Sequence, residues 1–104
     1  MTDDLDFVEQ AKLLALLANE KRLLIASCIL NEELNVRDLA EKVGLSQSAL
    51  SQHLARFREA GVVETRRDAQ TIYYSSSDSG IRRIIQALNQ IYDPSYKTAG
   101  AKPR

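Results

Sequence analysis

The sequence contains few of the residues that carry metal and redox chemistry. It has one cysteine and one histidine among 104 residues. One cysteine cannot form a disulfide within the chain, and a single free thiol fits a reducing cytoplasm. A lone histidine beside no cysteine is a poor metal ligand, and the sequence has no phosphate-binding glycine loop. We therefore expect no metal site, no cofactor and no catalytic centre, and a cytoplasmic protein.

Proline and glycine are also scarce, with two and four residues respectively. This composition is that of an ordinary globular protein, and the length fits one domain, 1–104. No apolar run approaches the roughly 18 residues of a membrane span. The N-terminal "MTDDLDF" is acidic and lacks the features of a signal peptide. Residues 94–104 are expected to form a frayed tail.

The formal net charge is zero, yet the charge is unevenly distributed. Residues 1–41 have a net charge of −5, residues 42–77 of +2, and residues 78–104 of +3. A nucleic-acid-binding protein needs a basic face and not a basic total. The polarised charge is therefore compatible with DNA binding, although it has other possible causes.

Apolar periodicity predicts helices over 4–18, 20–30, 36–43, 47–60 and 78–92. Asn19, Asn35 and Ser46 are the expected N-caps of three of them, and Gly44 and Gly61 close two. β-Branched and aromatic residues predict a hairpin from 62–67 and 70–75. The expected fold is therefore mainly α with a β-hairpin wing: a winged helix-turn-helix of four helices, two strands and a last helix.

The helix predicted over 47–60 has an unusual outward face. Leu50, Leu54 and Phe57 define its buried side, whereas the first two turns of the outward side are small, polar and free of acid. Short side chains let a helix enter the major groove, and glutamine can pair with adenine through two hydrogen bonds. The alternative is a solvated surface helix, which would normally use Glu, Lys and Arg.

We expect DNA contacts from this helix and from the tip of the hairpin. His53 lies on the border of the buried face, and Asp68 at the tip leaves open an ordinary solvated turn. The expected DNA-binding residues are Ser46, Gln47, Ser48, Ser51, Gln52, His53, Arg56, Arg66, Arg67 and Gln70.

The segments "LANEKRLLI" (17–25) and "ELNVRDLAEKVGLSQSALSQHLARFREAGVVETRRDAQTIYYS" (33–75), with the isoleucine-rich last helix, resemble the ArsR family of bacterial winged-helix regulators. Similarity is greatest to the branch that contains NolR and HlyU. The resemblance implies a homodimer, formed by the first and last helices, that binds an imperfect palindrome and usually represses transcription. The wide apolar stripes of both helices agree with such a two-fold interface. The expected interface residues are Phe7, Ala11, Leu14, Ile81, Ile84, Ile85, Leu88, Ile91 and Tyr92.

The sequence departs from the sensing members of that family. Metal sensors carry a Cys-x-Cys pair where this chain has Asn35 and Arg37, and its last helix offers only Asp78 as a ligand. Redox-sensing relatives use two cysteines, which align with Ser27 and Asp93. Cys28 is expected to be a buried structural residue. The alternatives are a redox-responsive regulator acting through Cys28, and a winged-helix protein-interaction module without DNA binding.

Overall fold

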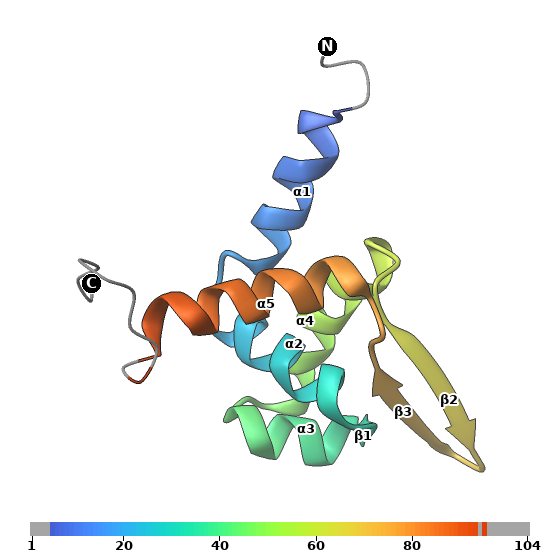
Figure 1. Cartoon of the computed structure of the whole chain (residues 1–104). Coiled ribbons are helices and arrows are strands. Elements are labelled where there is room, and N and C mark those ends of the chain that lie inside the picture. Colours follow the sequence, from blue (N-terminus) through green and yellow to red (C-terminus); the bar gives the residue numbers. More distant parts are fainter. Residues whose placement is uncertain (1–4, 94, 96–104) are drawn as a thin grey trace.

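A computed structural model describes residues 5–93 and 95 of the chain. The elements run α1 (Phe7–Leu17), α2 (Glu20–Asn31), β1 (Leu34–Asn35), α3 (Val36–Val43), α4 (Gln47–Glu59), β2 (Glu64–Asp68), β3 (Thr71–Ser75) and α5 (Ser79–Tyr92) (Figure 1). The predicted winged helix-turn-helix, with its order of helices and hairpin, is confirmed. The structure adds one short strand, β1.

Each helix begins at a short polar residue whose side chain accepts a hydrogen bond from a backbone N–H three residues later. The donor–acceptor distances lie between 2.7 and 3.1 Å. These bonds satisfy one of the N–H groups that a helix start leaves unpaired. Gly44 ends α3 with φ of 72°, a left-handed conformation that glycine adopts without strain. The caps are Asp6, Asn19, Asn35, Ser46 and Asp78.

The three strands form one antiparallel sheet in the order β1-β3-β2. β2 and β3 form the predicted hairpin, and β1 pairs with β3 only through Leu34↔Tyr74 and Asn35↔Tyr73. A strand of two residues is too short to show an alternating pattern, so β1 could not be predicted from the sequence. The tip of the hairpin therefore extends beyond β1 as a two-stranded ribbon.

The core lies between α2, α3, α4, α5 and the inner face of β3. Its fully buried large side chains include Phe57, Ile25 and Leu39, and Tyr74 packs on them from the sheet. α1 is different, because it projects from this body and its only buried residues are Leu16 and Leu17 of its last turn (Figure 1). Most of α1 is thus left without a partner inside the chain.

The apolar stripe of α5 is divided between the core and the surface. Ile81 has no exposed surface and Ile85 keeps only 8%. Both residues thus belong to the chain's own core, and their expected share in a dimer interface stays a prediction. Ile84 and Leu88 are partly buried. The remaining expected interface residues are exposed in the single chain, namely Phe7, Ala11, Leu14, Ile91 and Tyr92.

Among the described residues, no helix is long and apolar enough to cross a membrane. The tail expected over 94–104 lies outside the described residues except for Ser95.

Candidate DNA-binding surface

The helix-turn-helix consists of α3, the turn 44–46 and α4. The ammonium of Lys21, on α2, donates to the carbonyl of Val43 at 2.7 Å and so occupies one of the free carbonyls at the end of α3. The Ser46 hydroxyl accepts from the backbone N–H of Ala49 at 3.1 Å. It also lies 3.4 Å from the Ser48 hydroxyl. Ser46 therefore serves mainly to start α4, and its share in DNA contact stays a prediction.

The exposed face of α4 carries no acidic side chain until its last residue, Glu59. Leu50, Leu54 and Phe57 hold the opposite face with no exposed surface. The helix is thus fixed to the body along one side, and its polar side is free. The expected DNA-binding residues that lie on this free side are Gln47, Ser48, Ser51, Gln52 and Arg56.

His53 is half-buried, and its Nδ1 lies 3.5 Å from a terminal nitrogen of Arg22, on α2. An arginine can only donate, so a hydrogen bond between the two groups requires Nδ1 as the acceptor and the ring proton on Nε2. Burial, followed by the charges of Arg22 and Arg56, holds the pKa of His53 below its usual value. The ring is therefore neutral near pH 7.

Arg22 was not singled out in the sequence, although it ties α1 to α4. Besides facing His53, its guanidinium donates to the carbonyls of Leu16 and Ala15 in the last turn of α1. These partners are up to 31 residues from Arg22 along the chain, and no local pattern reveals such a contact. The guanidinium thus joins the projecting helix to the recognition helix.

The lowered pKa of His53 makes stability depend on pH. The unfolded chain binds this proton at a higher pH than the folded chain, so folding stability falls as the pH drops below about 6.5. We expect wild type to lose more stability than His53→Gln between about pH 7.5 and 5.5. Urea unfolding at both pH values measures this difference. Because His53 is the only histidine, equal losses in the two proteins would contradict the prediction.

The wing ends in a two-residue turn, Ala69–Gln70, between the paired residues Asp68 and Thr71. Ala69 adopts φ of 57°, in the left-handed region. Arg67 and Gln70 are exposed at this end of the hairpin. Both side chains are thus accessible, and their contact with a phosphate backbone stays a prediction.

Arg66 is not free in the way the sequence led us to expect. Its guanidinium makes an ion pair with Glu33 at 2.9 Å and lies 4.7 Å from the centre of the Tyr73 ring. Arg66 is thus already paired with a carboxylate, and its contact with a phosphate stays a prediction. The pairing joins residues 33 positions apart, so the local sequence around either one could not indicate it.

The wing is also tied to the recognition helix. Arg58, near the end of α4, donates to the Tyr74 hydroxyl at 3.0 Å, and the Tyr74 ring is buried. A polar tip bonded to α4 and a ring in the core are typical of a tyrosine that fixes two elements against each other. The position of the wing relative to α4 is thus set partly by this contact.

Cys28 is partly buried and packs against the core from α2, so it is less enclosed than expected. Burial raises the pKa of its thiol, while Lys42 lowers it and Glu32 raises it. A thiol with a raised pKa is mostly protonated near pH 7 and is a weak nucleophile. Within residues 5–93 and 95, no three His, Cys, Asp or Glu side chains converge as metal ligands would. The sensing behaviour stays a prediction.

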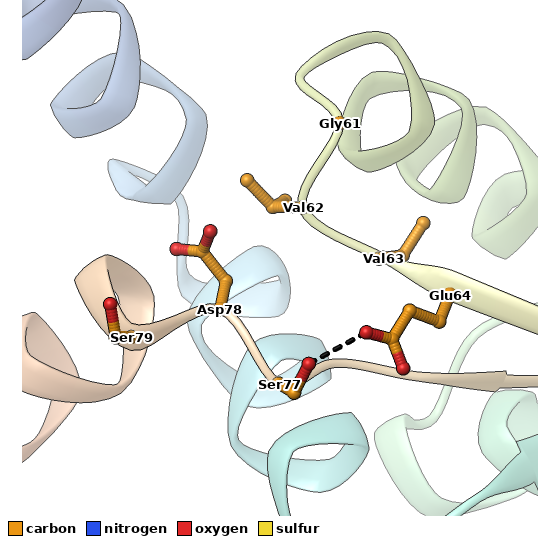
Figure 2. A pocket seen from close by; sticks show the side chains of 7 residues that line it. All are labelled: Gly61, Val62, Val63, Glu64, Ser77, Asp78 and Ser79. Atoms are coloured by element: carbon orange, nitrogen blue, oxygen red, sulfur yellow. Dashed lines mark hydrogen bonds between the residues drawn. The ribbon is translucent and has the colours of Figure 1, made fainter.

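A small concavity lies at the base of the wing, between the segment that leads from α4 into β2 and the segment that leads from β3 into α5 (Figure 2). The Ser77 hydroxyl donates to Glu64 at 2.6 Å, and Asp78 accepts from the backbone N–H of Ile81 at 2.9 Å. Both carboxylates are thus engaged by the protein itself. The residues around the concavity are Gly61, Val62, Val63, Glu64, Ser77, Asp78 and Ser79.

Known proteins are similar to this chain in both sequence and fold. The family model for bacterial regulatory proteins of the arsR family matches residues 19–65. The nodulation protein NolR of Rhizobium meliloti is 53% identical over 93 residues, which cover 89% of this chain and 76% of NolR. The crystal structure of NolR from Sinorhizobium fredii matches with a TM-score of 0.79 and 56% identity, covering 81% of this chain and 84% of that one.

Two further relatives are named as regulators of opposite sign. The transcriptional activator HlyU of Vibrio cholerae is 46% identical over 80 residues, 77% of this chain and 74% of HlyU. The structure of the transcriptional repressor BigR from Xylella fastidiosa matches with a TM-score of 0.76 and 34% identity, over 81% and 86% of the two chains. These relatives confirm the expectation of a regulator and not an enzyme. The chain belongs to the ArsR family of bacterial transcriptional regulators.

Proposed function

We propose that the chain binds operator DNA through α4 and the wing. The observation that supports this most is the free face of α4: exposed, polar and without acid through its first three turns. Serine and glutamine side chains there can reach base edges, and the helix N-terminus favours a nearby phosphate. Arg67 at the wing supplies a charge that can meet the DNA backbone.

We propose that the binding unit is a homodimer. Phe7 is 62% exposed and Leu14 59% exposed on α1, and Ile91 is 54% exposed at the end of α5. Exposed apolar side chains gathered on two helices mark an interaction surface. A two-fold axis would pair this surface with its own copy and present two recognition helices to an imperfect palindrome, about 34–36 Å apart.

We further propose that the bound dimer represses transcription by occupying promoter DNA in the cytoplasm. The relatives include a repressor and an activator, so the sign of regulation needs its own measurement. Selection of bound sites from a random oligonucleotide pool tests binding, symmetry and half-site sequence together. Transcription in vitro from a promoter that carries the selected site then gives the sign. Failure to enrich any sequence would favour a winged-helix interaction module.

Operator affinity is expected to be indifferent to metals and mild oxidants. Asn35 and Arg37 stand where metal sensors have thiolates, and the raised pKa of Cys28 slows its oxidation. The measurement is operator affinity with zinc, with EDTA, and with peroxide or polysulfide, for wild type and Cys28→Ser. A tenfold change, about 1.4 kcal/mol, under any condition would reject this expectation. If Cys28→Ser abolished that change, the lone thiol would be the switch.

A further inference from the structure

The Arg66 side chain is held by two different groups on the outer face of the sheet. Its terminal nitrogen donates to Glu33 Oε1 at 2.9 Å, and its Nε lies 3.0 Å from Oε2 and 3.1 Å from Oε1. Tyr73, its cross-strand partner on β3, lies under the guanidinium at 4.7 Å. Bidentate pairing combined with stacking on an aromatic ring fixes a guanidinium in both direction and plane.

This contact crosses the whole sheet. Arg66 is on β2, and Glu33 directly precedes β1, at the opposite edge, so the guanidinium reaches over β3. The row Asn35↔Tyr73↔Arg66 is the last in which three strands are paired. Beyond it only β2 and β3 continue, and a two-stranded ribbon is only marginally stable by itself. The contact therefore lies where the wing leaves the sheet.

The two neighbouring tyrosines of β3 hold the wing from opposite faces, because successive side chains of a strand alternate. Tyr74 is buried and accepts from Arg58 of α4, whereas Tyr73 lies under Arg66 on the outer face. The next residue of β2, Arg67, pairs with Ile72 and so lies on the opposite face of the sheet from Arg66. The two arginines thus point to different surroundings.

We propose that Glu33 and Arg66 are positioning residues that fix the angle of the wing, so that Arg67, and not Arg66, meets the DNA backbone. This inference rests on the proposed DNA-binding function. The Glu33 carboxylate already neutralises Arg66, and a phosphate approaching the same guanidinium would be repelled by Glu33. The hydrogen bond from Arg66 also lowers the pKa of Glu33, so the carboxylate stays charged through the neutral range.

Four variants test this assignment on the selected operator, with affinity measured across a range of salt concentrations. Arg67→Ala should flatten the salt dependence by about one unit per lost phosphate contact. Arg66→Ala should weaken binding several-fold while leaving the salt dependence unchanged. Glu33→Gln should also weaken binding, although removal of a negative charge from a DNA-binding protein would by itself tighten it. The charge swap Glu33→Arg with Arg66→Glu keeps the net charge and should recover most of the lost affinity.

Each outcome decides the matter. Tighter binding by Glu33→Gln, a salt dependence flattened by Arg66→Ala, or a swap that recovers nothing would each overturn the inference. The first two outcomes would also identify Arg66 as a phosphate contact. Glu33, Arg66 and Arg67 are all on the surface, and circular dichroism melting establishes that the variants fold. If wild type itself fails to bind the pool, the proposed function fails first.

Discussion

Replacing Leu14 with glutamate is expected to convert the proposed dimer into folded monomers that no longer hold the operator. Leu14 is 59% exposed in the single chain, so the carboxylate is solvated in the monomer and folding is not disturbed. In the dimer the same carboxylate would be buried without a partner, which costs several kcal/mol. The two-fold axis places this cost in both subunits at once.

DNA binding should fail together with dimerisation. A dimer that has bound one half-site holds its second recognition helix at a high effective concentration near the other half-site. A monomer loses this advantage and must bind each half-site alone. Sedimentation at micromolar concentration measures the association state, and a gel shift with the selected operator measures DNA binding.

Two further variants sharpen this test. Ile91→Glu, at 54% exposure near the end of α5, should act as Leu14→Glu does. Gln86→Glu adds the same charge to an exposed position of α5, about 140° around the helix from Ile91, and should remain dimeric. A stable monomer of the unmodified protein at micromolar concentration would refute the dimer, and so would unchanged association of both Leu14→Glu and Ile91→Glu.

Ile84 and Leu88 are less suitable for this purpose, although the stripe of α5 includes them. Both are partly buried within one chain, so a glutamate there could unfold the protomer and imitate loss of the dimer. The periodicity of α5 could not separate the core residues Ile81 and Ile85 from the exposed Ile91, since one continuous stripe serves both. Only the packing of α5 against the rest of the chain shows which residues of this stripe are buried and which are exposed.

The fold could be predicted because most of its determinants are local. Asn19, Asn35 and Ser46 cap helices at the expected positions, and Gly44 ends α3 through its left-handed backbone. The helix periods and the hairpin composition need no knowledge of distant contacts. β1 was missed because two residues carry no period, and its pairing with Tyr73 and Tyr74 bridges distant parts of the chain.

The candidate site could be predicted only in part, because some of its contacts join residues that are far apart in the sequence. The exposed face of α4 follows from helical geometry once Leu50 and Leu54 are placed in the core. The pairing of Arg66 with Glu33 and the contact of Arg22 with His53 each join α2, or the turn after it, to a segment far along the chain. The residues that flank an arginine in the sequence do not show whether its guanidinium will pair with a carboxylate of the protein or with a phosphate of DNA.

Gln52 and Arg67 are expected to make separable contributions to DNA binding. Gln52 is exposed on the acid-free face of α4, where its amide can donate to one atom and accept from another on the same base. Gln52→Ala should relax base preference and cost about 1–3 kcal/mol per half-site. Arg67 offers charge without a defined base partner, so Arg67→Ala should weaken all sequences alike. Selection from a random pool with each variant measures base preference directly.

The same selection also ranks the serines beside Gln52. Ser48 and Ser51 are exposed on the same face, and a serine hydroxyl can donate to a base edge or to a phosphate. Ser48→Ala and Ser51→Ala should therefore change preference at single positions of the half-site if they read bases, and change only affinity if they bind phosphate. The assignment of roles is reversed if Arg67→Ala alters the selected sequence while Gln52→Ala leaves it unchanged. In that case the wing reads the bases, and α4 provides the contact that holds the protein on the backbone.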